Sequence, residues 1–345
     1  MNTKHFKYLG CVALSVMCAI VSHAQSVSST PVGYVTLTIN GGGYTALSNP
    51  LENAVVYSGT ASSVSGSTIN ASFTMTDSEL AGSDLQSNST YYVQTSDGTI
   101  LDITANTTSS ITVAAASLSG IVSADDSITV KKYSTVGDLF GTDNSIGLAS
   151  GSNSGSSDLV YIMSSDGGGN YTTLYYQTDL LGFLGGNGWR VVGNAFSDAS
   201  GIILAPDDGV LVYRAGAGDL SLVVAGTVSA APANRSLPAG YSLISYPFPT
   251  DTTLADSGIY EAGNGYVSGS NAGNSDLVYV ISPDGQFTTY YYQTDLLGFL
   301  GGNGWRVVGN AFADVGGNSI PVGSSFIIYH TGSGLSWTDA LPYSL

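Results

Sequence analysis

The sequence predicts an all-β protein: two copies of a β-sandwich or barrel-like module, the first interrupted by a small inserted β-barrel domain. Short runs of Val, Ile, Thr and Tyr alternate with turn residues along the chain, and no long segment has helical periodicity. Nearly all of the acidic residues are Asp, which favours turns over helices. Residues 175–196 also recur without a single change as residues 291–312, which indicates an internal duplication.

The first predicted strands form a hairpin, in which residues 90–95 (TYYVQT) and 99–104 (TILDIT) flank the turn SDG. β-branched runs at 110–116 and 127–133 predict two more strands. One helical turn is expected within 178–186 (TDLLGFLGG), with Thr or Asp as its cap and Gly at its end. The remaining strands are expected in two matching sets, which are 158–163, 172–178, 189–196 and 209–215, and then 276–281, 288–294, 305–312 and 325–331.

The duplication extends beyond the identical run and sets the predicted domain boundaries. GYTALSNPL, which begins at Gly43, resembles GYSLISYPF at Gly240, and STVGD at Ser134 aligns with TTLAD at Thr252. The first copy therefore contains an insertion, and its strand-like ends can lie close together in space. The expected organisation is a signal peptide at 1–24, a first β module at 32–54 plus 134–225, an inserted small β-barrel at 55–133, and a second β module at 226–345.

The first residues have the features of a secretory signal peptide. Lys4 and Lys7 precede an apolar stretch, and small residues before Gln25 predict cleavage after Ala24. The expected location is secreted, extracellular or on the cell surface, with the periplasm as an alternative. No later run is long and apolar enough to predict a transmembrane segment. Cleavage removes both cysteines, so no disulfide is expected.

Charge and composition exclude several classes of protein. The chain has 25 acidic and 8 basic residues, a net charge of −17, so its surface repels phosphate backbones and nucleic acid is not an expected partner. His330 is the one histidine after the signal peptide, and no G-x-S-x-G motif occurs, which argues against a catalytic triad. No clustered His or Cys suggests a zinc site.

No cofactor is expected, and calcium is the one metal that the sequence suggests. SSDGGGN and APDDGV offer oxygen ligands, but ordinary turns explain both segments. A glycosidase would need two carboxyl groups that face each other across a cleft. Asp125 and Asp126, like Asp207 and Asp208, are adjacent in turns, so the sequence nominates no such pair and no catalytic residue.

Two parts of the second module carry a resemblance. GYSLISYPF, followed by VGSSFIIYH, is similar to a module of secreted bacterial proteins that reads GWNLISLP…GYWV. The whole chain resembles an uncharacterised secreted β-rich bacterial family with PVGYV after the signal peptide and a YYVQT…ITANTTSSITV hairpin. The resemblance implies export and a β fold, and it brings no activity or site residue.

The preferred functional hypothesis is a non-catalytic structural or surface and matrix interaction protein. Few charges, many Gly and Ser residues, no evident nucleophile and internal repetition favour it. The alternative is a carbohydrate-binding β protein, because sugars stack on aromatic rings and bind polar side chains. A glycoside hydrolase and an outer-membrane barrel are further alternatives. The candidate ligand-binding residues are Tyr176, Gln177, Trp189, Tyr292, Gln293 and Trp305.

The connection inside the identical run is unusually apolar for a hairpin loop. Leu181 and Phe183 lie in the first copy of this loop, and Leu297 and Phe299 lie in the second. Exposed apolar patches of this kind usually have a partner. We therefore expect the two loops to bury these four residues against each other or against another molecule, and self-association is a candidate function alongside binding of a surface glycan.

Overall fold

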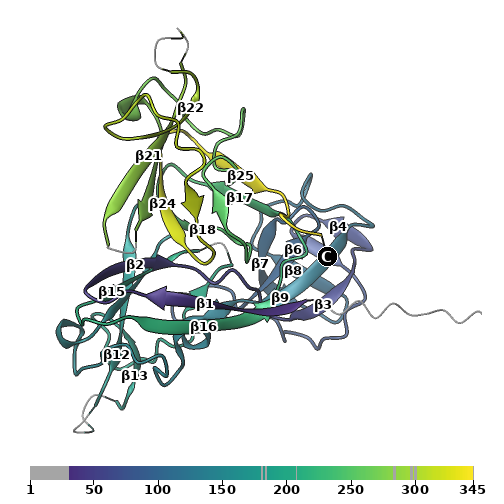
Figure 1. The fold of residues 1–345 in the computed structure, drawn as a ribbon. Helices are drawn as coiled ribbons and strands as arrows, with labels where there is room; N and C mark the ends of the chain where they lie inside the picture. The colour runs from purple at the N-terminus through teal and green to yellow at the C-terminus, as the bar shows by residue number, and fades with distance from the viewer. Residues whose placement is uncertain are drawn as a thin grey trace, which may run out of the picture. The chain divides into compact units, whose positions relative to one another are not determined.

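The computed structural model describes residues 31–344, apart from 180, 181, 183, 184, 207, 283, 284, 296, 297, 299 and 300. The described residues confirm the predicted all-β class, with several antiparallel sheets and one short α-helix (Figure 1). The predicted signal peptide lies outside them. No helix in the described part of the chain is both long and apolar enough to cross a membrane.

Two five-stranded antiparallel sheets dominate the structure, and their strands occur in the same order. The first sheet runs β13 (Gly188–Val191), β12 (Tyr171–Gln177), β11 (Leu159–Met163), β15 (Val210–Arg214) and β2 (Gly43–Leu47). The second sheet runs β22 (Gly304–Val307), β21 (Phe287–Gln293), β20 (Leu277–Ile281), β24 (Ser325–His330) and β18 (Gly240–Ser245). Every predicted strand of the two matching sets contributes to these sheets.

Smaller elements also occur twice, in the same order along the chain. Two short ladders pair β10 (Ser134–Thr135) with β14 (Ile203–Leu204), and β19 (Thr252–Thr253) with β23 (Ser319–Ile320). Two ribbons pair β1 (Val32–Ile39) with β16 (Leu220–Thr227), and β17 (Ala233–Leu237) with β25 (Leu335–Asp339). The 3₁₀ turns η1 (Ser154–Ser156) and η2 (Ala272–Asn274) are capped by Asn153 and Asn271.

Each five-stranded sheet packs on both of its faces. One face of the first sheet covers a core that contains Val160, Leu174 and Trp189, and the matching face of the second sheet covers a core with Val278 and Trp305. The opposite faces meet each other, because strands place alternate side chains on opposite sides. The residues buried between the two sheets are Met163, Leu211, Leu243 and Ile327.

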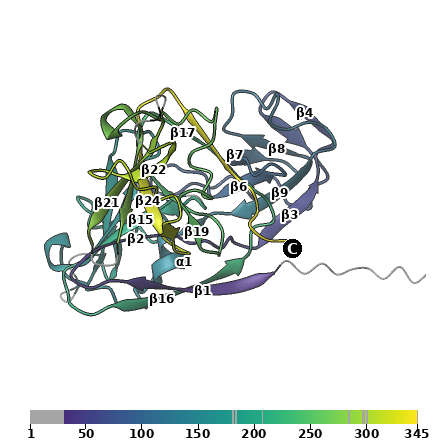
Figure 2. The ribbon, with the colours of Figure 1, turned by 45° about the horizontal axis from the view of Figure 1, so that its top comes forward.

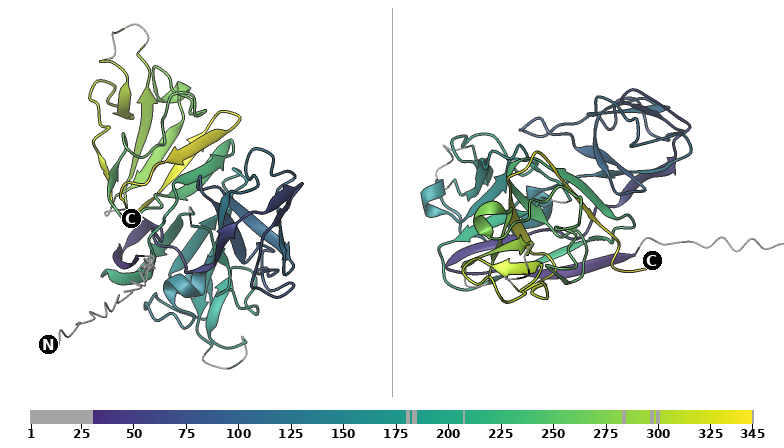
Figure 3. Two further views of the ribbon diagram at one scale, coloured as in Figure 1. Left: turned by 90° about the vertical axis from the view of Figure 1, so that its right-hand side faces the viewer. Right: turned by 90° about the horizontal axis from the view of Figure 1, so that it is seen from above.

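Residues 55–132 form a separate seven-stranded sheet around their own core (Figures 2 and 3, purple and blue). Its order is β3 (Val55–Thr60), β9 (Ser127–Lys132), β6 (Tyr91–Thr95), β7 (Ile100–Asn106), β8 (Ser110–Val113), β5 (Thr68–Asn70) and β4 (Ser63–Ser65). The structure does not show the predicted small barrel as a closed one, since no ladder joins β3 to β4 among the described residues. Between them Ala61 N donates to Asp126 O and Ser62 N to Asn70 O, so the chain passes from one end of the sheet to the other.

The helix, α1 (Val136–Phe140), begins where the inserted strands end. Thr135 and Asp138 form a capping box, in which each side chain bonds to the backbone N–H of the other residue. Val136 and Phe140 then bury their side chains in the first core. The sequence carries this T-x-x-D signal, but the predicted helical turn was placed instead within 178–186, part of which lies outside the described residues.

A buried ion pair joins the inserted strands to the chain on either side of them. The Lys131 ammonium on β9 donates to the Glu52 carboxylate, which precedes β3, and to Gln94 Oε1 on β6 at 2.7 Å. Ser229 also donates to Glu52, at 3.4 Å, from the segment that leads to β17. Both charged side chains are about 95 % buried, so each depends on the other to offset its loss of hydration.

We predict that Lys131→Met destabilises the protein by about 3–5 kcal/mol, because it leaves the Glu52 carboxylate buried without a countercharge. The double variant Glu52→Gln/Lys131→Met should recover a large part of that loss. Urea unfolding followed by tryptophan fluorescence measures both, and Lys132→Met, at an exposed neighbouring position, is the matched control. Equal unfolding midpoints for Lys131→Met and Lys132→Met would contradict the prediction.

Candidate functional site

A roomy polar hollow lies where the inserted strands meet both modules. It has a volume of about 710 Å³. The inserted segment contributes Gln86, Asn88 and Asp102, and the hairpin of β11 and β12 contributes Ser164 and Thr172. The rest of the wall includes Tyr133, Ile203, Asp208, Arg235, Ser236 and Pro238. We call this hollow the junction cleft.

Two polar pairs fix the walls of the junction cleft. Arg235 Nη2 on β17 donates to Asp208 Oδ1 at 2.9 Å, so one wall carries an ion pair between the two modules. On the inserted side, Tyr133 OH donates to Asp102 Oδ1 at 2.6 Å. The Tyr133 ring packs against Tyr92, with ring centroids 4.5 Å apart. Two carboxylates and one guanidinium leave the lining slightly acidic and rich in hydrogen-bonding groups.

An aromatic hollow adjoins the junction cleft. Gln86 and Thr172 line both hollows, and Gln86 Nε2 donates to Thr172 Oγ1 at 2.5 Å on the boundary between them. The second hollow has a volume of about 430 Å³ and is lined by Leu85, Val192 and the ring of Tyr171. Tyr171 is 43 % exposed, so a ligand in the junction cleft can extend onto an accessible ring.

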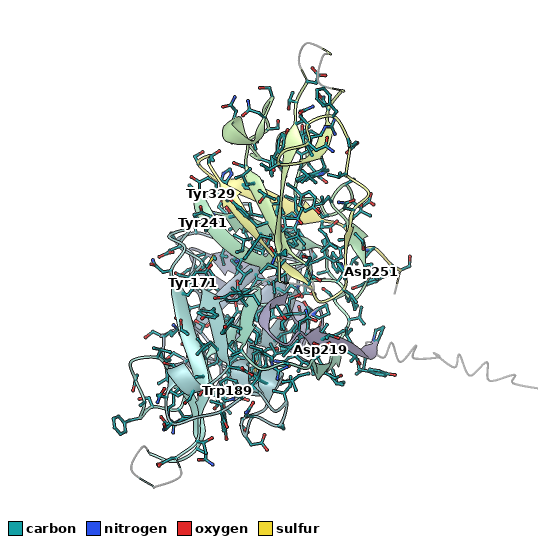
Figure 4. The ribbon with its side chains drawn as sticks, turned by 60° about the vertical axis from the view of Figure 1, so that its left-hand side comes forward. Tyr171, Trp189, Asp219, Tyr241, Asp251 and Tyr329 are labelled. Atoms are coloured by element: carbon teal, nitrogen blue, oxygen red, sulfur yellow. The ribbon has the colours of Figure 1, made fainter. Side chains whose placement is uncertain are left out.

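Tyr171 belongs to a cluster of tyrosines that spans the two five-stranded sheets (Figure 4). Its ring centroid is 6.0 Å from that of Tyr161, which is 6.3 Å from that of Tyr44. On the second sheet the rings of Tyr241 and Tyr329 are 4.6 Å apart. Burial raises the pKa of Tyr171, and nearby Tyr241 and Tyr44 raise it further, so its hydroxyl stays protonated.

The structure places the predicted ligand-binding residues elsewhere, and mostly inside the protein. Gln177, Gln293, Trp189 and Trp305 are at most 2 % exposed, so they offer no surface on which a sugar could bind. Tyr176 packs edge-on against Trp189. Tyr292 stacks on Tyr260 with ring centroids 3.4 Å apart, and it also meets Trp305 edge-on.

The buried polar residues of the identical run hold the backbone of their own loop. Gln177 Nε2 donates to the carbonyl oxygens of Gly186 and Ala195. Arg190 is 3 % exposed and donates to the same two carbonyls and to those of Gly185 and Trp189. In the second copy Gln293 and Arg306 make the corresponding bonds, to Gly302 and to the carbonyls of Gly301, Gly302, Trp305 and Ala311.

This polar cage gives a physical reason for three of the identical letters in each copy, which in the first copy are Gln177, Gly188 and Arg190. A Cβ at Gly188 would lie 2.7 Å from Arg190 Nη1, and a Cβ at Gly304 would lie 2.8 Å from Arg306 Nη1. Any other residue at either glycine would displace the guanidinium. The predicted contacts of Leu181, Phe183, Leu297 and Phe299 lie outside the described residues and stay a prediction.

The remaining titratable groups do not form a catalytic or metal-binding constellation in the described part of the chain. His330 is buried, and its Nδ1 lies 2.7 Å from Asp276 Oδ2. Arg214 and Asp158 form the corresponding buried pair in the first module. Among the described residues no group of three His, Cys, Asp or Glu could hold a metal ion. In SSDGGGN, Asp166 Oδ1 accepts a bond from Gly168 N, as in an ordinary turn.

Comparisons with protein-family models, with curated proteins and with solved structures find no match for this chain. The chemistry of the junction cleft is therefore the basis for a functional proposal. Sequence reasoning missed its residues, because they come from segments far apart in the chain and most of them are ordinary polar side chains. One signal was present: Tyr171 and Phe287 begin matching strands, so both copies place an aromatic ring at the start of the same hairpin strand.

We predict that Arg190→Met and Arg306→Met each destabilise the protein by about 2–4 kcal/mol, because each removes four hydrogen bonds that a buried guanidinium donates to the backbone of its loop. The two losses should be similar, since the cages match. Arg190→Lys is the matched comparison: it keeps the charge but lacks the fork of donors, so it should recover little of the loss. If Arg190→Lys unfolds at the wild-type urea concentration, the hydrogen-bonded cage is not what stabilises the loop.

A further hollow, separate from the two described above, contains Asp339 and predicts that stability depends on pH. Asp339 lies there beside Tyr246, and burial raises the pKa of Asp339 to about 7. The folded state therefore binds a proton more tightly than the unfolded state, whose Asp pKa is 3.8. Stability from this group is fully present below the unfolded pKa and is lost as pH rises from about 4 to 7. Asp339→Asn should make the melting temperature vary less with pH over this window. Asp125→Asn, a control at an exposed position, should leave the pH dependence as in the wild type.

Proposed function

We propose that the protein is an exported, non-catalytic interaction protein whose junction cleft binds a polar carbohydrate chain. The observation that carries the proposal is a roomy cleft lined by amide, hydroxyl, carboxylate and guanidinium groups, with the accessible ring of Tyr171 in the adjoining hollow. Sugars need both kinds of contact, because their hydroxyl groups form hydrogen bonds and their C–H faces pack on aromatic rings.

The charges of the site favour a neutral or cationic sugar over an anionic ligand. Asp102 and Asp208 both line the junction cleft, and Arg235 already pairs with Asp208. A phosphate or a polyuronate would meet an unbalanced carboxylate in a chain with a net charge of −17. A neutral glycan meets no such repulsion.

We also infer that residues 32–54 with 134–225 and residues 226–345 are two copies of one β module, with 55–133 inserted in the first. The shared strand order of the two five-stranded sheets supports this inference. The insertion matters to the proposed function because Leu85, Gln86 and Asp102 belong to it. The second module has no counterpart of these residues, so the proposed ligand site occurs once.

Hydrolysis is the alternative that the cleft itself raises. Asp102 and Asp208 line one hollow, and a glycosidase requires two carboxyl groups that face each other across its cleft. Both carboxyl groups, however, are engaged by protein groups, Asp102 by Tyr133 and Asp208 by Arg235. We therefore expect binding without turnover, and a reducing-end assay on any glycan that binds separates the two functions.

The proposal predicts that the purified full chain selects neutral or cationic glycans on a glycan array. Calorimetry with the best glycan should then show that Tyr171→Ala weakens binding about three- to tenfold, the value of one aromatic contact. Phe287→Ala is the matched control, since it removes the ring at the equivalent position of the second sheet, outside the lining of both hollows.

Two results would contradict the proposal. One is an array on which the protein binds no glycan at all. The other is a glycan that binds equally well to the wild type and to Tyr171→Ala but is lost in Phe287→Ala, which would move the site to the second sheet.

A further inference from the structure

The β1 edge of the ribbon formed by β1 and β16 is open along its whole length in the described structure. Val228 N donates to Pro31 O, so residue 31 faces β16 with its backbone groups. In an antiparallel ladder every second residue does so, and the odd-numbered residues of β1 therefore exchange hydrogen bonds with β16. The backbone groups of Val32, Tyr34, Thr36 and Thr38 therefore point away from β16. Within the part of the chain that the structure describes, these groups have no hydrogen-bond partner. In Figure 2 the ribbon runs along the lower edge of the picture.

The edge of β1 lacks the usual protection against pairing with another chain. Natural edge strands are short, bulged or interrupted by Lys or Pro. β1 has eight residues in unbroken register with β16, and neither strand contains a charged residue or a proline. The side chains of two residues whose backbone groups point to this edge are also accessible, since Val32 is 75 % exposed and Tyr34 is 77 % exposed.

Each of the other three edges of the two ribbons is contacted at one point by the chain itself. On β16, Thr227 exchanges two backbone hydrogen bonds with Glu52, which blocks one end of that edge. In the second ribbon Asn234 on β17 forms a parallel bridge with Thr99, and on β25 Ser336 N donates to Asn264 O. Of the four ribbon edges, that of β1 is the one with no such contact anywhere along it among the described residues.

We propose that the protein forms a homodimer in which the β1 strands of two copies pair antiparallel across a twofold axis at Val35. The residues that face outward are all even-numbered, so pairing about Val35 sets Tyr34 opposite Thr36 of the second copy, and Val32 opposite Thr38. Every outward backbone group then finds a partner in one four-stranded sheet, with the strand order β16, β1, β1 and β16.

The uncharged ribbon allows a second copy to approach despite the net charge of the chain. Two chains with a net charge of −17 repel each other over most of their surfaces, but the ribbon is an uncharged area on each. Because the pairing is isologous and Glu52 blocks part of the β16 edge, the contact closes at two copies rather than propagating into a filament. This proposal is independent of the ligand in the junction cleft.

Sedimentation velocity on the purified full chain tests the proposal over the micromolar range. The wild type should change from one chain to two as concentration rises. Thr36→Pro should remain a single chain at every concentration, because proline removes one outward N–H without breaking a bond to β16. Thr36→Val keeps the N–H and the β-branched shape, so it should dimerise as the wild type does.

Circular dichroism and the melting temperature establish that each variant is folded. If Thr36→Pro does not fold, Tyr34→Lys/Thr38→Lys replaces it, since these two exposed side chains would bring four positive charges together across the axis. A wild type that stays monomeric throughout would overturn the proposal. So would a dimer that persists unchanged in the folded edge variants.

Discussion

The buried ion pair of Glu52 and Lys131 fixes the position of the inserted strands relative to the modules. Glu52 precedes β3 and Lys131 lies on β9, which are the first and last strands of the insertion. Gln94 donates to the Glu52 carboxylate and accepts from the Lys131 ammonium, and Ser229 donates to the same carboxylate. The junction cleft depends on this arrangement, since one of its walls belongs to the insertion and the other walls belong to the modules. A single buried charge pair thereby links the stability of the fold to the geometry of the proposed ligand site.

The two five-stranded sheets repeat one strand order, and the seven-stranded sheet of residues 55–132 has no counterpart among the described residues. The two five-stranded sheets bury the same kinds of residue on corresponding faces, and their outer hairpins use the same polar cage around Arg190 and Arg306. Only the first module carries Gln86 and Asp102 beside its aromatic hairpin. Tyr171 and Phe287 therefore occupy equivalent places, but a polar cleft adjoins Tyr171.

The ribbons show a comparable division between equivalent elements. The chain itself covers the edge of β17 through Thr99, which again belongs to the insertion. The equivalent edge of β1 has no such cover among the described residues. One inserted segment thus builds the junction cleft and protects one ribbon, and the other ribbon is left able to pair with a second molecule.

The sequence by itself determined the fold class, the strand pattern and the extent of the repeated elements. Local alternation and turn residues fix strands wherever one face is buried, and identical segments fold alike because they meet the same local constraints. It could not determine which side of each strand would face solvent: both faces of the five-stranded sheets are covered, so alternation does not separate buried Gln177 and Trp189 from exposed residues. The burial of Gln177 and Trp189, the pairing of β3 with β9 and of β4 with β5, and the assembly of the cleft from Gln86, Thr172 and Arg235 were decided by tertiary structure alone. These features depend on contacts between segments far apart in the chain, whose partners no local pattern records.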